Sequence, residues 1–310
     1  MLSTCSCFCI PTTQDKAEYA MTIITTLPLS CSNLSLSATL LNRRLSNPVV
    51  NLRHISRRRC YFRVAAVSDG GAMILHDAGA TVAVMTGAYA LVATFDYLTQ
   101  RNIIQQKFSR KMVHILSGFL FMASWPIYST STEARYFASI VPLVNLSRLV
   151  VNGLSFAQDE GLIKSVTREG KPEELLKGPL FYVLILIICA VAFWRESPVG
   201  VVSLAMMCGG DGIADIMGRR FGTLKIPYNK QKSWAGSISM FVFGFLMSIG
   251  MLYYFSALGY FQLDWIWTIE RVAFISLLAT AVESLPAAWM VDDNLSVPLV
   301  SMIAAYSTFQ

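Results

Sequence analysis

From residue 75 onward, long apolar stretches alternate with short polar segments along the chain. The stretches are close to the length of about 20 residues that an α-helix needs to cross a bilayer. They predict an all-α, polytopic transmembrane bundle of seven or eight spans without internal repeats, with the spans at 78–95, 112–128, 136–157, 179–194, 198–217, 237–260, 272–289 and 295–309. The last stretch is short, and a re-entrant segment is the alternative there.

The composition supports a membrane protein. Hydrophobic residues make up 54% of the 310 residues and charged residues only 14%, whereas soluble domains carry roughly 25% charged residues. We therefore expect one membrane-embedded domain over residues 65–310, in contact with membrane lipids.

The formal net charge of +6 comes from one end of the chain. Residues 1–64 contain eight Lys or Arg and two acids, and the remaining residues contain equal numbers of basic and acidic side chains. The segment is rich in Ser, Thr and Arg and has no acid between Glu18 and Asp69, which is typical of a chloroplast-type transit peptide. A disordered basic tail is the alternative. The balanced charge of the remainder gives no reason to expect a nucleic-acid partner.

Basic residues are concentrated in every second connecting segment. The first, third and fifth segments contain thirteen Lys or Arg, whereas the second, fourth and sixth contain three. By the positive-inside rule, the basic segments face the compartment from which the protein is inserted, which is the stroma in a plastid. The same alternation places Asp292 and Asp293 on this side. We therefore expect an active site at the basic end of the bundle.

Two acids interrupt one of the most apolar stretches, in the sequence CGGDGIADIMGRRFG (208–222). Helical residues four apart share a face, so Asp211, Asp215 and Arg219 form one stripe. Neighbouring carboxylates repel each other unless a cation lies between them, and acids within a membrane span usually mark a functional site. Because Mg²⁺ prefers carboxylate and phosphate oxygens, we predict a Mg²⁺ site at the two acids. The alternatives are an internal Asp–Arg salt bridge and a pathway for protons or cations. Three glycines are expected to let a ligand approach the backbone: Gly209, Gly210 and Gly212.

The next segment, FGTLKIPYNKQKSWAGS (221–237), has the composition of a phosphate site. Lysines supply positive charge to phosphates, and the N–H groups at a helix N-terminus bind anions. The predicted ligands are Lys225, Lys230, Lys232, Ser233 and Gly236. An ordinary positive-inside loop is the alternative. Together with the acids, the segment predicts a site for phosphoryl or nucleotidyl transfer.

These motifs resemble the polyprenol-kinase family, which includes dolichol kinase and the plant phytol and farnesol kinases. GGDGIADIMGRRFG and KIPYNKQKSWAGS carry the resemblance most clearly. Further motifs resemble the chloroplast phytol kinases: RKMVHILSG (110–118), STEARYFASIVPLVN (131–145), IKSVTREGKPEELLKGPLFYVL (163–184), WRESP (194–198) and VDDNLSVPL (291–299). The resemblance covers about residues 75–300 and departs from the family at ESLPAAWMVDDN (283–294), where the family usually has a more polar linker.

The resemblance implies a kinase that uses CTP to phosphorylate phytol in a chloroplast membrane, more specifically the envelope. Phytol released from chlorophyll would become phytyl phosphate on the way to tocopherol. By motif match, Asp211 and Asp215 would hold Mg²⁺ on the CTP phosphates. Arg219 and the three lysines would neutralise charge on the transferred phosphoryl group.

Other polar residues have two interpretations each. His114 is a candidate general base, or pairs with a backbone carbonyl. Asp292 and Asp293 are candidates for a second metal or for activating the alcohol, or else cap a helix beside Asn294. The segment 164–179 either forms a second wall of the site, through Arg168, Glu173, Glu174 and Lys177, or is a solvated helix of mixed charge.

Two predictions concern residues within the spans. Glu283 needs a partner, for which Arg148 is the candidate. The alcohol is expected to enter from the lipid along a groove between helices, and small residues of the sixth span either line this groove or serve close packing: Gly236, Ser237, Ser239 and Gly244.

Other activities fit the same residues. A membrane cytidylyltransferase would use similar metal and lysine chemistry to attach CMP to a lipid phosphate. A kinase for farnesol or geranylgeraniol would differ only in the length of its acceptor. A transporter would use the intramembrane acids for cations, but it would be expected to show inverted repeats.

Overall fold

The computed structural model describes residues 70–157, 159–167, 170–286 and 292–309. The predicted transit peptide (1–64) and Arg168 lie outside these residues. The elements are α1 (Gly70–Gln100), α2 (Gln106–Ala123), η1 (Trp125–Ile127), α3 (Ala134–Gly153), α4 (Glu160–Val166), η2 (Pro172–Leu176), α5 (Gly178–Ile188), η3 (Cys189–Phe193), α6 (Pro198–Ala205), η4 (Met206–Asp211), α7 (Gly212–Phe221), β1 (Lys225–Ile226), β2 (Asn229–Ser233), α8 (Trp234–Ala257), α9 (Trp265–Ser284) and α10 (Asp293–Phe309).

The helices confirm the predicted all-α architecture. Each predicted span overlaps a helix. Among the described residues, six helical segments rather than the predicted seven or eight are long and apolar enough to cross a membrane: Gly71–Gln100, Ala134–Gly153, Pro172–Phe193, Pro198–Phe221, Trp234–Ala257 and Trp265–Ser284. Helices α2 and α10 are not among them. The predicted start of the seventh span at 272 is wrong. Helix α9 begins at Trp265 because the side chain of Asp264 accepts hydrogen bonds from the backbone N–H groups of Ile266 and Trp267.

The segment that carries the two acids is the central helix of the bundle. In Pro198–Phe221, 83% of the most apolar stretch is buried, against 17–44% in the other five candidate spans. Helices α8, α10 and α2 pack around it. Side chains of this helix therefore contact protein rather than lipid, which lets it carry charged groups.

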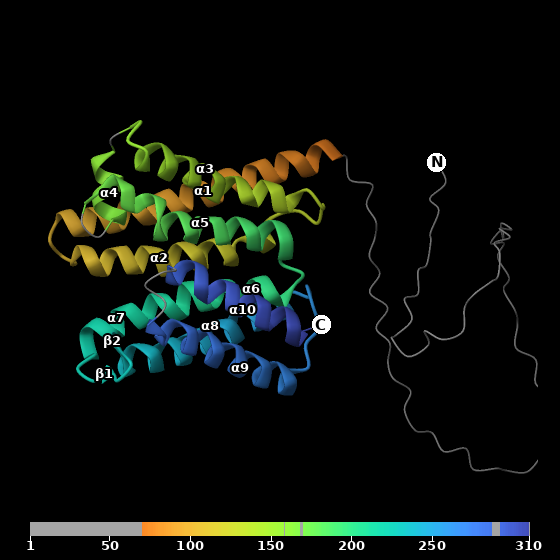
Figure 1. Ribbon diagram of the computed structural model, residues 1–310. Helices are drawn as coiled ribbons and strands as arrows, with labels where there is room; N and C mark the ends of the chain where they lie inside the picture. Colours follow the sequence, from red (N-terminus) through yellow and green to blue (C-terminus); the bar gives the residue numbers. More distant parts are fainter. Residues whose placement is uncertain (1–69, 158, 168–169, 287–291, 310) are drawn as a thin grey trace, which may run out of the picture. The chain divides into compact units, whose positions relative to one another are not determined.

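The helices form two groups that meet near this central helix (Figure 1). Helices α1, α2, α3 and α5 lie in one group, and α6 to α10 lie in the other. Contacts of α2 with α7 and of α5 with α10 join the two groups. Side chains of α2 consequently reach the acids of the central helix.

The basic connecting segments gather at one end of this unit. In Figure 1, the α1–α2 connection, α4 and the β1–β2 hairpin lie at the same end. The hairpin leads into α8, whose N-terminus is capped by Ser233: the side-chain Oγ accepts a hydrogen bond from Gly236 N at 3.2 Å. This arrangement brings the predicted phosphate segment to the end of the central helix.

At the opposite end, a buried arginine holds the chain together. Arg195 is 2% exposed, and its guanidinium donates hydrogen bonds to the backbone carbonyls of Trp125, Tyr128 and Ser129. It also lies 4.9 Å from the ring centre of Tyr260. Because all these partners are main-chain or aromatic groups of neighbouring turns, Arg195 serves the fold.

Candidate active site

The central helix widens into a π-helical turn where it carries its first acid. This turn, η4, ends at Asp211 and continues directly into α7. π-Helical turns are rare within α-helices and occur frequently at functional sites, since the inserted residue changes the direction of the side chains that follow. Asp211 is 4% exposed, so its carboxylate must be compensated within the protein.

The compensating charge comes from α2. Lys111 Nζ donates a hydrogen bond to Asp211 Oδ2 at 3.2 Å and lies 3.9 Å from Asp215 Oδ2. The lysine side chain is 12% exposed and that of Asp211 is 6% exposed. The ammonium group is thus a cation shared by the two carboxylates, as their repulsion requires.

The second acid also binds its helical neighbour. Arg219 Nε donates to Asp215 Oδ1 at 3.0 Å, and a terminal guanidinium nitrogen lies 2.9 Å from the same atom. This confirms the predicted stripe and shows that the internal Asp–Arg salt bridge exists. The Oδ2 atom of Asp215 is buried without a hydrogen-bond partner among the described residues.

His114 lies one turn after Lys111 on α2. Its Nε2 atom is 3.9 Å from Asp211 Oδ2 and 3.4 Å from the carbonyl oxygen of Met207. The ring lies 4.2 Å from that of Tyr182, whose hydroxyl donates to the His114 carbonyl at 2.8 Å. The expected pairing with a backbone carbonyl is present, and the proximity to Asp211 keeps a role in proton transfer open as a prediction.

A second lysine joins another pair of carboxylates. Lys232 Nζ, from β2, donates to Glu283 Oε1 on α9 and, at 2.8 Å, to Asp293 Oδ2 at the start of α10. Burial alone would lower the pKa of Lys232, but the two carboxylates outweigh this effect and raise the pKa above its usual value. The ammonium group therefore stays charged at physiological pH.

The predicted pairing of Glu283 with Arg148 is wrong. Arg148, in α3, instead binds Asp159 at the start of α4, with a nitrogen–oxygen distance of 2.5 Å. The hydrogen bond from Arg148 holds the pKa of Asp159 below its usual range. Glu283 lies near the end of α9 on a buried face, which turns it toward the hairpin. Its partner is therefore Lys232, the nearest cation on the hairpin side.

The two lysine–carboxylate clusters are close enough to interact. The charge of Asp211 interacts electrostatically with Lys232, Glu283 and Asp293. Several buried oxygens near these groups have no hydrogen-bond partner in the part of the chain that the structure describes: Asp215 Oδ2, Glu283 Oε2, Asp293 Oδ1, Asn294 Oδ1 and Ser296 Oγ. Unsatisfied buried acceptors of this kind are uncommon, and they point to a site that receives a cation or donor groups from a ligand.

The predicted Mg²⁺ at Asp211 and Asp215 can be compared with this donor set. Within residues 70–157, 159–167, 170–286 and 292–309, no group of three or more His, Cys, Asp or Glu side chains could hold a metal by itself. Mg²⁺ is usually bound by one or two carboxylates together with waters and substrate phosphates. Two acids with a free buried oxygen fit a Mg²⁺ that is shared with a phosphate ligand.

The three glycines beside Asp211 serve helix packing in the structure. A Cβ at Gly209 would lie 3.0 Å from Met247, one at Gly210 3.4 Å from the Met240 carbonyl, and one at Gly212 2.3 Å from Ile115. These spaces are filled by α8 and α2, so the glycines bring helices together around the acid. The expectation that they leave room for a ligand is not supported at these three positions.

The small residues of α8 also serve packing, as the second interpretation predicted. A Cβ at Gly236 would lie 3.1 Å from the carbonyl oxygen of Ala214, and one at Gly244 would lie 2.6 Å from Met206 Sδ. Ser237 and Ser239 are buried in the same helix. The two glycines let α8 approach the central helix closely.

The remaining predicted residues are distributed around the basic end. Lys225 and Lys230 are exposed on the hairpin, and Lys177 is exposed before α5. Asp292 Oδ1 accepts a hydrogen bond from Asn294 N at 2.9 Å, so Asp292 caps α10 as the alternative proposed. Whether these residues also bind a ligand stays a prediction.

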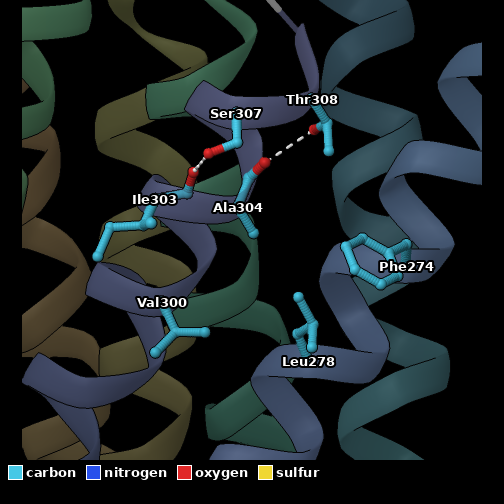
Figure 2. Close-up of a pocket in the computed structure, with 7 residues that line it drawn as sticks. All are labelled: Phe274, Leu278, Val300, Ile303, Ala304, Ser307 and Thr308. Atoms are coloured by element: carbon cyan, nitrogen blue, oxygen red, sulfur yellow. Dashed lines mark hydrogen bonds between the residues drawn. The ribbon is translucent and has the colours of Figure 1, made fainter.

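The described residues line a polar cavity and an apolar groove. The polar cavity, of about 200 Å³, is lined by Gln106, Lys107, Arg110, Thr167 and Arg219 at the basic end. The apolar groove, of about 300 Å³, lies between α9 and α10 and is lined by Phe274, Leu278, Val300, Ile303, Ala304, Ser307 and Thr308 (Figure 2). The Ser307 and Thr308 hydroxyls donate to carbonyls of their own helix, which leaves the groove apolar.

Comparison with known proteins decides the family. The chain is 69% identical over 247 residues to the probable phytol kinase 1, chloroplastic, of Glycine max, covering 80% of this chain and 82% of the relative. It is 67% identical over 236 residues to the phytol kinase 1, chloroplastic, of Arabidopsis thaliana, covering 76% and 78%. The chain belongs to the polyprenol-kinase family.

A more distant relative of this polyprenol kinase is named for another alcohol. It is the farnesol kinase, chloroplastic, of Arabidopsis thaliana, at 42% identity over 246 residues, or 79% of this chain and 80% of the relative. No family model and no solved structure matches the chain. The names of the relatives and the apolar helices agree with the predicted multi-pass protein of a chloroplast membrane.

Sequence reasoning missed the roles of two residues in this candidate site. Lys111 was seen only as part of a basic loop, although it provides the charge between the two acids. Glu283 was assigned to the wrong cation. A signal for Lys111 was present in the sequence, since Lys111, His114 and Ile115 share one helix face and all three lie against η4 or α7.

Proposed function

We propose that this polyprenol kinase transfers the γ-phosphoryl group of CTP to phytol and forms phytyl phosphate, a step toward tocopherol. The observation that carries the proposal is the pair of lysine–carboxylate clusters at the basic end, Lys111 with Asp211 and Asp215, and Lys232 with Glu283 and Asp293. Oxygen donors for a metal and cations for phosphates are the parts that phosphoryl transfer requires. The names of the relatives supply the class of acceptor.

Mg²⁺ would be held by Asp211 and Asp215 together with the phosphates of CTP. When bound, the ion neutralises phosphate charge as a Lewis acid. Lys111 places a positive charge beside both carboxylates in the buried helix, and Arg219 orients Asp215 through two close nitrogen–oxygen contacts. These residues hold the acids in position before CTP arrives.

In the transfer, the hydroxyl oxygen of the alcohol forms a bond to the γ-phosphorus, the bond from this phosphorus to the β-phosphate oxygen breaks, and CDP leaves. The hydroxyl proton passes to a carboxylate. Asp293 is the acceptor that we propose, because its Oδ1 is buried without a hydrogen-bond partner while Lys232 holds its Oδ2. His114, beside Asp211, is the alternative base.

The acceptor alcohol carries a long apolar chain that must stay within the membrane. We propose that the chain lies in the apolar groove between α9 and α10 (Figure 2). These two helices also carry Glu283 and Asp293, and Val300, Ala304 and Asp293 share one face of α10. Val300 is seven residues from Asp293, about 10 Å along the helix. An alcohol whose chain lies in the groove would therefore place its hydroxyl end near Glu283 and Asp293.

The proposed orientation of the protein in the membrane follows from the charge of its connecting segments. The basic connecting segments would face the stroma, where CTP is available, and the envelope is the proposed membrane. CTP and Mg²⁺ are parts of one hypothesis that a single assay can test.

The test uses purified protein in liposomes with phytol, Mg²⁺ and CTP that carries label on the γ-phosphate. The proposal expects labelled phytyl phosphate, and it expects Asp211→Asn to lower the rate by about 10²-fold or more. If label on the α-phosphate appears in a lipid instead, the protein is a cytidylyltransferase. If neither label moves in a folded preparation, the acids do not serve phosphate chemistry.

A second acceptor deserves measurement because one relative is a farnesol kinase. Competition between phytol, geranylgeraniol and farnesol in the same assay gives the ratio of kcat/KM values. A preference for farnesol would replace phytol in the proposal without changing the mechanism. Substitution of ATP or UTP for CTP tests the donor in the same way.

A further inference from the structure

The polar cavity at the basic end has walls from three elements that are distant in the sequence. Gln106, Lys107 and Arg110 come from the first turns of α2, Thr167 ends α4, and Arg219 lies in the last turn of α7. Three of these five lining residues are cationic and none is acidic. We propose that this cavity binds the phosphates of the nucleoside triphosphate donor.

The inference rests on the proposed function and makes its donor site specific. The hairpin, where the sequence placed the phosphate ligands, offers little net positive charge near the acids. Lys232 is bound by two carboxylates, and neither Lys225 nor Lys230 lines the polar cavity with the other cations. Tertiary structure instead gathers cations from α2 and α7 around a cavity of about 200 Å³.

Arg219 connects the cavity with an acid of the central helix. Arg219 lines the cavity and also holds Asp215 Oδ1 at 2.9 Å. Arg110, another lining residue, directly precedes Lys111, which binds Asp211. Phosphates in this cavity would therefore lie beside the carboxylates, which is where a shared Mg²⁺ needs them.

The helix that forms one wall adds a favourable field. Gln106 is the first residue of α2, an 18-residue helix, and the preceding residue Gln105 makes no side-chain capping hydrogen bond. The N-terminus of such a helix carries partial positive charge and attracts anions. The lining by Gln106 and Lys107 places this end at the cavity.

The phosphate chemistry that this cavity recognises also occurs on anionic lipids, so the experiment needs an arm for each source. Lys107 is the residue to change, because it is exposed and its substitution leaves the packing of α2 intact. The variants are Lys107→Gln, Lys107→Arg as the rescue, and Arg220→Gln as a matched control. Arg220 is also exposed on α7, next to Arg219, but does not line the cavity.

Binding of labelled CTP to protein in phosphatidylcholine nanodiscs is measured first, with inorganic triphosphate as competitor. Loss of one charge-assisted contact predicts that Lys107→Gln raises the Kd and the KM for CTP about tenfold, while the KM for phytol stays within about twofold. Lys107→Arg restores most of the CTP affinity, Arg220→Gln matches the wild type, and triphosphate competes with CTP.

Two outcomes overturn the inference. If Lys107→Gln binds CTP as the wild type does but loses activation by phosphatidylglycerol, the cavity binds a lipid phosphate. If neither property changes, the cavity binds neither ligand. Failure of the proposed function is distinct: CTP would then bind with the expected dependence on Lys107, but no phytyl phosphate would form.

Discussion

Lys111 Nζ lies 3.2 Å from Asp211 Oδ2, although one hundred residues separate them in the chain. The contact joins the two groups of helices, because Lys111 belongs to α2 and Asp211 to the central helix. A buried ion pair of this kind contributes less through its own attraction than through the cost of leaving one partner alone. The pair thus ties the fold to the site.

Removal of the lysine should therefore affect stability and activity differently. Lys111→Met leaves Asp211 as an uncompensated buried charge, and we expect a loss of about 3 kcal/mol or more in the free energy of unfolding. The double variant Lys111→Met/Asp211→Asn should recover much of this loss but remain inactive. Denaturant unfolding in detergent and the kinase assay measure the two effects. Equal stability of the single and double variants would contradict a direct pairing.

Gly212 should matter through packing. A Cβ at this position would lie 2.3 Å from Ile115, so Gly212→Ala is expected to push α2 away from α7 and to separate Lys111 from the acids. Activity and the melting temperature should both fall, and the free energy of unfolding should decrease by about 1–3 kcal/mol.

A compensating change distinguishes this explanation from a ligand contact. Gly212→Ala/Ile115→Ala makes room for the added methyl group and should regain part of the activity. Gly79→Ala on α1, where nothing lies within 4 Å of the new methyl group, is the control and should lower neither stability nor activity, since alanine favours the helix. If the double variant regains no activity, Gly212 acts through a ligand contact and not through packing.

The stability that Lys232 contributes should be insensitive to moderately alkaline pH. Burial opposes its charge, but the carboxylates of Glu283 and Asp293 raise its pKa above the usual value of 10.5. The stabilisation is then fully present below the unfolded pKa and is lost only as the pH rises through the folded pKa. The difference in melting temperature between wild type and Lys232→Met should stay constant from about pH 7 to about pH 9.5. A difference that shrinks within this range would mean that Lys232 is not held by both acids.

The groove between α9 and α10 predicts an effect on the acceptor. Ala304→Phe would fill the space beside Phe274 and Leu278, and we expect the KM for phytol to rise by about 10–100-fold, since the loss of a buried chain segment costs about 1–3 kcal/mol. The KM for CTP should not change. Leu299→Phe, exposed on the same helix outside the groove, is the matched control. If both variants behave alike, the chain binds elsewhere.

Local sequence is enough to predict most of the spans, the basic end of the bundle and the stripe of Asp211, Asp215 and Arg219. Apolar length fixes a span because a helix rises by a constant amount per residue. The spacing of four residues fixes the Asp215–Arg219 contact because both residues belong to one helix. Each of these properties depends on neighbours within one element.

The charges that meet across helices depend on the packing of the helices against one another. The pairing of Lys111 with Asp211, the pairing of Glu283 with Lys232 rather than Arg148, and the gathering of Lys107, Arg110 and Arg219 around one cavity depend on how each helix is rotated against its neighbours. That rotation is set by packing of small residues and side chains between helices, such as Gly212 against Ile115, which local spacing does not encode.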